Sequence, residues 1–467
     1  MPGLGSRIAS FVEKHSAVRP LQSHAVGGQG HEDASGMTIV VIGGGLAGPA
    51  FARRALTLAR ELGVDIRIEL LTRPSCNYCA GLVTDVSLKS MKQLYRLTIP
   101  PDVIKETINE VVFINPQEWA AIPLLEPLTS VLRTSRFKQQ GFDESWVENV
   151  FQDLRSQANF NVQRDAKVVN VESKDGGGFK ITYERSGAQL TLDADVLAIA
   201  TGLKSIQQPW MQKFVEEYGY RPPGLMDASV TEINTTKATH YDLGGKVLVI
   251  DGVIRNCIAA FIPKGKGWLT VTGLGKILAD HDLEVLFNHP RVRKYIELDQ
   301  VIDNLRCKKI CSASVIVSPA RKFCGDSWVM IGDLTGYGRV MKDGYFAALQ
   351  SADLAARTIL VNGWSESAFR EHYARPLRKL AFDNRLGMWM FWFDQKIIKG
   401  RFGTYLLTNA LREMRGDKRG GMITAAFRGL FSGELSYKQI YALFTAGTLA
   451  HGIGLHRKCP EDTDECP

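Results

Sequence analysis

Two patterns of hydrophobic residues alternate along the first two thirds of the chain. Residues 38–42 (Thr-Ile-Val-Val-Ile) form a continuous run of mostly β-branched residues, which indicates a strand buried on both faces. Apolar residues then recur at helical spacing from Ala50 to Leu62. The same patterns predict strands at 64–71, 195–200 and 327–332 and a helix at 344–360. This order of elements predicts an α/β fold with a parallel sheet.

A glycine-rich segment joins the first strand to the first helix. Gly43, Gly45 and Gly48 follow the spacing G-x-G-x-x-G. Glycines at these positions let the backbone turn tightly and approach a pyrophosphate, and the helix N-terminus directs free N–H groups at its charge. Placed between a strand, a helix and a second strand, the motif predicts a dinucleotide-binding fold that begins at Met37.

The second strand should end in a carboxylate that binds the ribose hydroxyls of the dinucleotide. Glu69 lies 21 residues after Gly48, close to the usual spacing, but Leu70 and Leu71 still have strand character. We therefore expect either Glu69 at the ribose or, if the strand continues to Thr72, a hydroxyl group or Arg73.

Two later segments identify the expected cofactor as FAD. The strand at 195–200 leads into Ala-Thr-Gly202, and the strand at 327–332 ends in Gly332-Asp333, followed by a helix that begins at Gly344. These segments resemble the Ala-Thr-Gly and Gly-Asp motifs of flavoproteins with two dinucleotide folds. The resemblance implies that Asp333 binds the ribityl chain and that the helix N-terminus faces the flavin pyrimidine ring, where it stabilises the negative charge of reduced flavin.

A second nucleotide site is not expected. Residues 244–252 begin like a dinucleotide-binding strand, but no G-x-G-x-x-G follows Asp251 and Gly252. We therefore expect an external electron donor, either a docking protein, a quinone or a transiently bound nicotinamide.

Two more segments extend the resemblance to residues 37–360. Arg133 and the Phe142-Asp143 pair resemble the R…FD…L stretch of p-hydroxybenzoate-hydroxylase-like flavoproteins, which implies that Arg133 belongs to the cofactor site. Residues 259–275 predict two strands joined by a Pro-Lys-Gly hairpin and resemble geranylgeranyl reductases, which use FAD to saturate isoprenoid double bonds. An aromatic pair of those enzymes is replaced here by Ile258 and Ala260. Residues 76–81 (Cys-Asn-Tyr-Cys-Ala-Gly) and the helix start at 339–344 resemble a bacterial group of oxidoreductases with a CNxCGG motif.

Cys76 and Cys79 are the tentative catalytic residues. Their C-x-x-C spacing has four interpretations: residues that line the flavin pocket, a redox-active dithiol, half of a metal or cluster site, or two structural thiols. Cys307 and Cys311 form the other close pair, and their spacing matches no recognisable zinc or iron–sulfur motif, so no metal is predicted. Histidines make no metal-binding or general-base pattern.

Composition and charge indicate where the protein is located and which region could contact a partner. Eight cysteines in 467 residues are not a disulfide framework, which indicates a reducing, cytoplasmic setting. No secretory signal or membrane-spanning segment is predicted. Between residues 370 and 428 there are 13 Lys/Arg and 5 Asp/Glu, interleaved with aromatic residues. This region is a helical cap on the cofactor domain, a peripheral contact with a membrane surface, or the mouth of a channel for an apolar substrate. No nucleic-acid partner is expected.

The predicted architecture is a three-layer FAD-binding, Rossmann-like domain with an inserted, mostly antiparallel sheet domain and a helical C-terminal extension. Its expected parts are a disordered tail (1–36), the FAD-binding domain (37–360) with insertions at about 83–135 and 205–315, the helical region (361–450) and a tail (451–467).

The expected function is an FAD-dependent oxidoreductase acting on a small or lipidic apolar substrate, such as an isoprenoid double bond. The alternatives are a flavin monooxygenase or halogenase, a protein like electron-transfer flavoprotein–quinone oxidoreductase, and a binding protein whose flavin never turns over.

Overall fold

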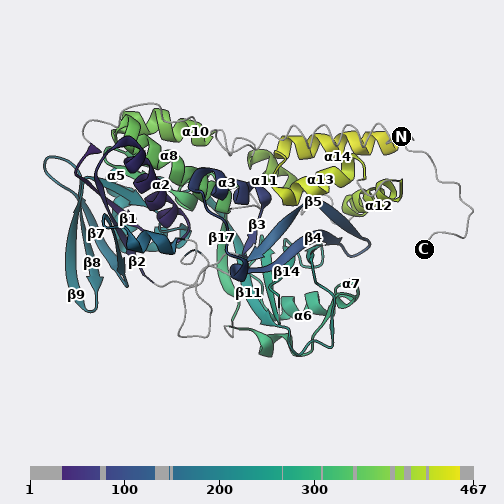
Figure 1. Ribbon diagram of the computed structural model, residues 1–467. Helices are drawn as coiled ribbons and strands as arrows, with labels where there is room; N and C mark the ends of the chain where they lie inside the picture. The colour runs from purple at the N-terminus through teal and green to yellow at the C-terminus, as the bar shows by residue number, and fades with distance from the viewer. Residues whose placement is uncertain are drawn as a thin grey trace, which may run out of the picture.

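The computed structural model describes most of the chain, and it has two lobes joined side by side (Figure 1). One lobe is built around a parallel sheet and the other around a larger, mostly antiparallel sheet. The described residues are 34–73, 80–131, 147, 151–265, 267–306, 309–339, 344–378, 384–393, 401–416 and 420–452.

Sheet A, the six-stranded sheet of the first lobe, has the order β18-β19-β10-β1-β2-β6, and all of its strand pairs are parallel except β18–β19. The central strands consist of buried apolar residues, as expected for a parallel sheet that is covered on both faces. The strands are β1 (Met37–Ile42), β2 (Ile66–Thr72), β6 (Phe160–Arg164), β10 (Val196–Ile199), β18 (Cys324–Gly325) and β19 (Trp328–Met330).

Sheet A is the middle of three layers, which confirms the predicted fold class (Figure 1). Helices α2 (Ala47–Leu62) and α8 (Gly344–Arg357) pack on one face. The antiparallel meander β7 (Lys167–Ser173), β8 (Phe179–Arg185) and β9 (Ala188–Ala194) belongs to the same hydrophobic core. Other helices of this lobe are α3 (Asp85–Tyr95), α5 (Pro209–Tyr218), α9 (Glu366–Ala368) and α10 (Arg375–Arg378).

A buried ion cluster fixes α2 against α8. The Arg54 side chain on α2 donates from Nε to Asp353 Oδ1 on α8 at 2.6 Å, and Arg357 Nε lies 2.9 Å from Asp353 Oδ2. All three side chains are largely buried. Removing one member would leave a buried charge without its partner, so the cluster holds the two helices, and with them their N-termini, in one relative position.

Sheet B, the eight-stranded sheet of the second lobe, has the order β17-β11-β15-β14-β13-β4-β5-β3. Only β13–β4 is a parallel pair. Because β13 is followed by its antiparallel neighbour β14, the segment 244–252 belongs to sheet B and to no second dinucleotide fold. The strands are β3 (Leu82–Val83), β4 (Ile104–Ile114), β5 (Trp119–Val131), β11 (Gly224–Asn234), β13 (Lys246–Asp251), β14 (Ile258–Pro263), β15 (Trp268–Leu274) and β17 (Cys311–Ser318).

Alternate residues of sheet B enter two different cores. In β14, Ile258, Ala260 and Ile262 face the C-terminal helices, whereas Ala259 and Phe261 pack toward α6 (Asp280–Asn288) and α7 (Pro290–Arg293). This period of two is the ordinary consequence of the pleated strand. Sheet B therefore separates two cores: one lies between the sheet and helices α6 and α7, and the other lies between the sheet and the C-terminal helices.

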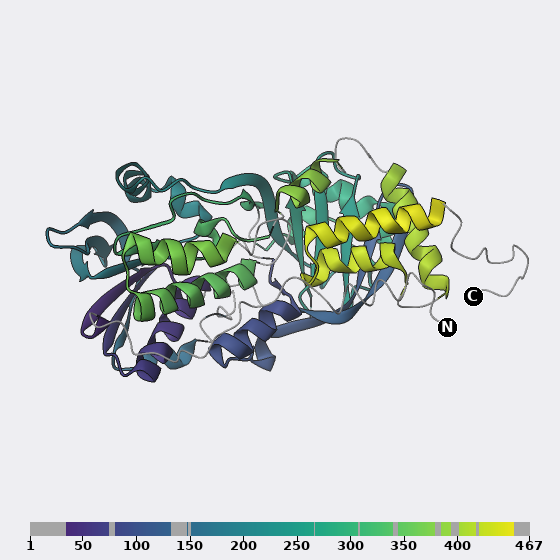
Figure 2. The same ribbon diagram turned by 90° about the horizontal axis from the view of Figure 1, so that it is seen from above.

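The C-terminal region covers that second side. Helices α13 (Met422–Ser432) and α14 (Tyr437–Gly452) run next to each other across the lobe, with α11 (Asn384–Phe393) and α12 (Arg401–Gly416) beside them (Figure 2). Glu413 on α12 is buried and accepts hydrogen bonds from the backbone N–H groups of Gly421, Ile423 and Thr424, so it caps α13. In the described residues, none of the helices has the length and apolar character required to cross a bilayer.

Candidate functional site

The three predicted cofactor motifs meet at one edge of sheet A. Strands β1, β10 and β19 are neighbours and parallel, so the residues that follow them emerge together. Ala200 N donates to Ile42 O at 2.7 Å, and Ile331 N donates to Ile199 O at 2.9 Å. The loops that begin at Gly43, Ala200 and Gly332 therefore lie side by side, although more than 100 residues separate each from the next along the chain.

Two glycines of the first loop are required by close packing. A Cβ atom at Gly43 would lie 2.4 Å from Ala200 O, and a Cβ at Gly48 would lie 1.9 Å from Gly43 O. Gly45 differs, because a Cβ there would meet nothing within 4 Å. The outer glycines shape the turn, while the middle one leaves open space beside the backbone. This combination fits a dinucleotide whose pyrophosphate would occupy that space.

The N-terminus of α2 is electrostatically suited to the same group. Its cap residue Leu46 makes no side-chain hydrogen bond, and its first turn contains no acidic residue. The unpaired N–H groups and the helix dipole favour an anion at this position. The Gly332-Asp333 loop lies against the N-terminus of α2, since a Cβ at Gly332 would lie 2.9 Å from Ala47 Cβ.

Asp333 connects the loops to the N-terminus of α8. Its Oδ1 lies 3.5 Å from where a Cβ of Gly344 would be. Burial raises the pKa of Asp333 to about 6. A carboxyl group held at the wall of an apolar cavity can accept hydrogen bonds from hydroxyl groups, which is the role that the flavoprotein resemblance implies for Asp333 at a ribityl chain.

Strand β2 continues to Thr72, so Glu69 lies inside the strand rather than at its end. The Glu69 carboxylate is 2% exposed and is bonded within the sheet: Arg67 Nη2 donates to Oε1 at 2.7 Å, and Asn161 Nδ2 donates to Oε2 at 2.8 Å. Because the strand continues to Thr72, the expectation that applies is the second one: Arg73, which is exposed just after the strand, or a hydroxyl group would bind the ribose.

Three predicted site residues, Cys76, Cys79 and Arg133, lie outside the described part of the chain. The four interpretations of the C-x-x-C pair therefore stay predictions. Elsewhere in the described part, no group of three or more His, Cys, Asp or Glu side chains is placed to hold a metal ion. Gly81, directly after the cysteine loop, accepts a hydrogen bond from the buried Lys264 ammonium at 2.8 Å, and Val131 O accepts another at 3.0 Å.

A cavity of about 780 Å³ adjoins these motifs. Leu203, Asp333 and Gly344 line it on the side of the first lobe, and sheet B and the C-terminal helices form its other walls. Its volume is within the range of about 300–1,000 Å³ typical of small-molecule sites. The cavity therefore connects the predicted flavin position with the space between sheet B and the helices.

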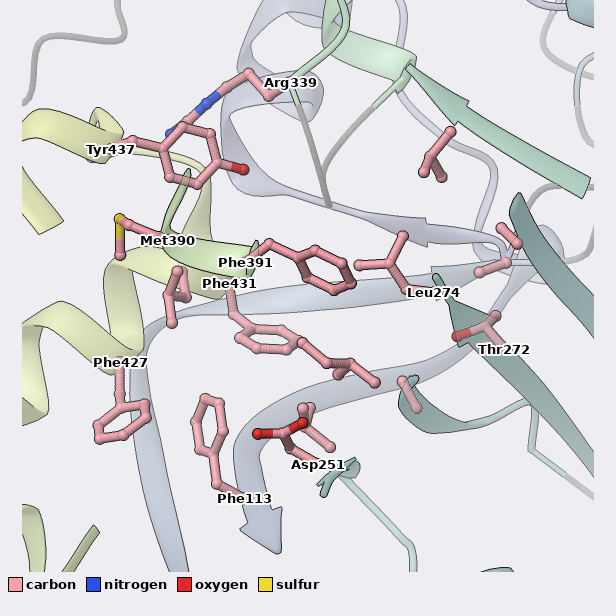
Figure 3. A pocket seen from close by; sticks show the side chains of 18 of the residues that line it. Phe113, Asp251, Thr272, Leu274, Arg339, Met390, Phe391, Phe427, Phe431 and Tyr437 are labelled. Carbon is pink, nitrogen blue, oxygen red and sulfur yellow. The ribbon is translucent and has the colours of Figure 1, made fainter. Parts of the chain in front are cut away.

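The walls of the cavity are mainly apolar and rich in phenylalanine (Figure 3). The Phe113 ring lies 4.6 Å from that of Phe427 and 5.5 Å from that of Phe431, measured between centroids. The strand side includes Val230, Val249, Ile258, Ala260, Ile262, Leu274 and Ile316, and the helix side includes Phe391, Leu406, Leu407, Leu430 and Phe444. Such walls favour an apolar ligand and exclude water from it.

Few polar side chains reach this space. Asp251 and Thr272 lie at the strand side, and Arg339 and Tyr437 lie near the top of the view in Figure 3. The Arg339 guanidinium is bound to protein, because it donates to Gly433 O at 2.8 Å and Leu435 O at 2.6 Å. It also lies over the Tyr437 ring, 4.8 Å from the centroid. Arg339 therefore ties the α13–α14 connection to the loop before α8.

Sequence reasoning missed most of the cavity residues. The aromatic C-terminal region was expected as a cap, a membrane-surface contact or a channel mouth for an apolar substrate, and no motif indicated that its phenylalanines face sheet B. One signal was present: Ile258 and Ala260, which replace the aromatic pair of geranylgeranyl reductases, both line the cavity. Smaller side chains at these two positions leave space that aromatic rings would fill.

The chain has the fold of several flavin-dependent enzymes of known structure. No family model and no curated protein matches the sequence. Among solved structures, the chain is similar to a geranylgeranyl bacteriochlorophyll reductase-like protein from Thermoplasma acidophilum, with a TM-score of 0.62 and 14% identity over 89% of this chain and 96% of that one.

Two further neighbours have the same fold. A flavoprotein/dehydrogenase from Cytophaga hutchinsonii has a TM-score of 0.61 and 12% identity over 88% of this chain and 100% of that one. The p-nitrophenol 4-monooxygenase from Pseudomonas putida has a TM-score of 0.53 and 15% identity over 88% and 98% of the two chains. Flavin-dependent halogenases are also among the neighbours. The similarity establishes the fold, and at these identities it leaves the reaction open.

Proposed function

We propose that this protein is an FAD-dependent oxidoreductase that saturates a carbon–carbon double bond in a long, apolar substrate of the isoprenoid type. The observation that carries the proposal is the phenylalanine-lined cavity that adjoins Asp333 and Gly344. A substrate in this cavity would lie next to the loops that fit the cofactor.

The residues of the two lobes have separate roles in this proposal. The loop from Gly43 to Gly48 and the N-terminus of α2 would hold the pyrophosphate, and Asp333 would hold the ribityl chain. Bound FAD would supply hydride transfer, which saturates a double bond when one proton is also delivered. The cavity walls would orient the substrate chain and keep water away from it.

The electrons would come from an external donor. Strand β13, the one other segment that resembles a nucleotide-binding strand, lies in the middle of sheet B, between β14 and β4. This position supports a donor that binds transiently, such as a reduced protein or a free nicotinamide.

The test is an anaerobic absorption experiment on the purified full-length protein supplied with FAD. Reduced enzyme should be reoxidised by geranylgeraniol without oxygen, and the product should gain two hydrogen atoms by mass spectrometry. The fully saturated alcohol is the matched control, which should leave the flavin reduced. A protein that binds no flavin would overturn the whole proposal.

Two other outcomes would favour one of the alternative functions instead. Reoxidation that needs oxygen and adds an oxygen or a halogen to the substrate would indicate a monooxygenase or halogenase. A flavin that no donor reduces would indicate a binding protein.

A further inference from the structure

The largest group of exposed hydrophobic side chains lies on the C-terminal helices. Twelve large hydrophobic residues are exposed in the described part of the chain, and five of them lie on α11, α12 and α14. We call these five the apolar rim: Trp389, Trp392, Tyr405, Tyr441 and Leu449, with exposed fractions of 42%, 50%, 37%, 43% and 59%. Clustered exposed side chains of this kind mark an interaction surface more often than isolated ones do.

Contacts between the three helices make the rim continuous. The Trp389 ring on α11 lies 5.8 Å from the Tyr441 ring on α14, edge to face. Tyr405 on α12 donates a long hydrogen bond of 3.5 Å to Thr448 O on α14. The rim is therefore one surface that three separate helices build together.

The exposed side of α14 carries no charge from residue 441 to residue 449. Tyr437, Ile440, Leu443 and Phe444 are buried. The exposed side from residue 441 to 449 consists of Tyr, Ala, Thr, Ala and Leu, with no charge. This uncharged stretch, with Tyr441 and Leu449 exposed, is suited to a cover of protein or lipid.

The rim also surrounds an entrance to the cavity. Trp389, Tyr441 and Leu449 are exposed, and all three also line the cavity. An apolar ligand could therefore pass directly between the cavity and whatever covers the rim.

In the part of the chain that the structure describes, the exposed charged side chains on α11, α12 and α14 are positive. Helices α11 to α14 contain six Lys/Arg residues and one acidic residue, Glu413, which is buried. Arg385, Arg412, Arg415 and Lys438 are exposed. Tryptophan and tyrosine favour the headgroup region of a bilayer, and cationic side chains are attracted to anionic lipids.

We propose that the apolar rim docks on the surface of an anionic lipid bilayer and that the cavity exchanges its ligand with that bilayer between α11 and α14. Membrane docking goes beyond the proposed reaction, although the docking proposal and the reaction involve the same cavity. Lipid binding is measured without turnover, so failure of one proposal is distinguishable from failure of the other.

The experiment is cosedimentation of the FAD-loaded full-length protein with vesicles of phosphatidylcholine alone or mixed with phosphatidylglycerol. We expect binding to the mixed vesicles, at least fivefold weaker binding to the neutral ones, and loss of binding as salt rises. Trp392→Ser should weaken binding about tenfold, because Trp392 belongs to the rim but not to the cavity wall. The matched control is Leu190→Ser, which alters a residue of β9 that is 40% exposed.

Melting temperatures and FAD content of both variants show whether they fold like the parent. Arg385→Glu supplies a second, electrostatic variant, which should weaken binding to the mixed vesicles only. The inference is overturned if the parent protein binds neither vesicle, or if Trp392→Ser binds as well as Leu190→Ser. It is also overturned if sedimentation shows a dimer that Trp392→Ser dissociates, because the rim would then cover a second copy of the chain.

Discussion

The two lobes contribute to one cavity by different physical means. The lobe around sheet A places backbone at the site: a turn in which Gly43 and Gly48 leave no room for a Cβ, and the N-terminus of α2, which has no acidic cap. The lobe around sheet B places side-chain volume there, from strands and helices far apart in sequence. Backbone geometry tolerates almost no substitution, whereas an apolar wall tolerates many of similar volume. The first lobe should therefore determine whether a cofactor binds, and the second which substrate fits.

The sharpest test of this division is a pair of glycine variants in the first lobe. Gly48→Val should lower the free energy of unfolding of the apoprotein by about 3 kcal/mol or more, because its side chain would collide with the Gly43 carbonyl. Gly45→Val should leave that free energy within about 0.5 kcal/mol, since the space beside Gly45 is open. It should nevertheless weaken FAD binding by about 100-fold, because the pyrophosphate needs the same space.

Urea unfolding of the apoproteins and fluorescence titration with FAD measure both effects. If Gly45→Val binds FAD normally, the open space is not the pyrophosphate site, and the assignment of the first lobe is wrong.

These glycines also explain why the first lobe was predictable. A dinucleotide loop requires particular residue types at fixed spacing, so Gly43, Gly45 and Gly48 could be identified without a structure, and β1, α2 and β2 followed from periodicity. The cavity leaves no comparable pattern. Phe113 and Phe427 are more than 300 residues apart, and each reads as an ordinary core residue of its own element. Their meeting depends on how α13 packs over sheet B, which local sequence does not encode.

The second prediction concerns the carboxyl group at the boundary between the lobes. The pKa of Asp333 is raised to about 6 in the fold, above the ordinary 3.8, so the folded protein holds this proton more tightly than the unfolded chain does. The free energy of unfolding of the apoprotein should therefore fall as pH rises from about 4 to about 6 and be constant above that, by roughly 1–3 kcal/mol in total.

Asp333→Asn should remove this dependence, which urea unfolding at pH 4.5 and 7.5 would detect as a difference from the parent. The variant should also bind FAD more weakly, if the carboxylate accepts ribityl hydroxyl groups. An unchanged pH dependence in Asp333→Asn would show that other groups cause it.

The third prediction alters the second lobe alone. Ala260→Phe should fill part of the cavity and reduce kcat/KM for a long isoprenoid substrate by about tenfold, which corresponds to about 1.4 kcal/mol. FAD affinity should change less than twofold, because Ala260 belongs to the sheet B wall. Ala260→Ser is the matched control, since it changes polarity with little change in volume. A large loss of FAD from Ala260→Phe would contradict the separation of the two lobes.

The smallest effect on function is expected at Glu69. This prediction distinguishes the ribose role that the sequence motif assigns to Glu69 from the structural role that its hydrogen bonds indicate. Glu69→Gln should lower the free energy of unfolding by about 1–2 kcal/mol, because the carboxylate accepts charge-assisted hydrogen bonds from Arg67 inside the sheet. The FAD affinity of Glu69→Gln should stay within twofold of the parent. Arg73→Ala, which alters the residue after the strand end, should weaken FAD binding more than Glu69→Gln does. The two variants are compared by fluorescence titration and urea unfolding. If Glu69→Gln loses FAD tenfold and keeps its stability, the carboxylate reaches the ribose after all, and β2 must end earlier in the cofactor-bound protein.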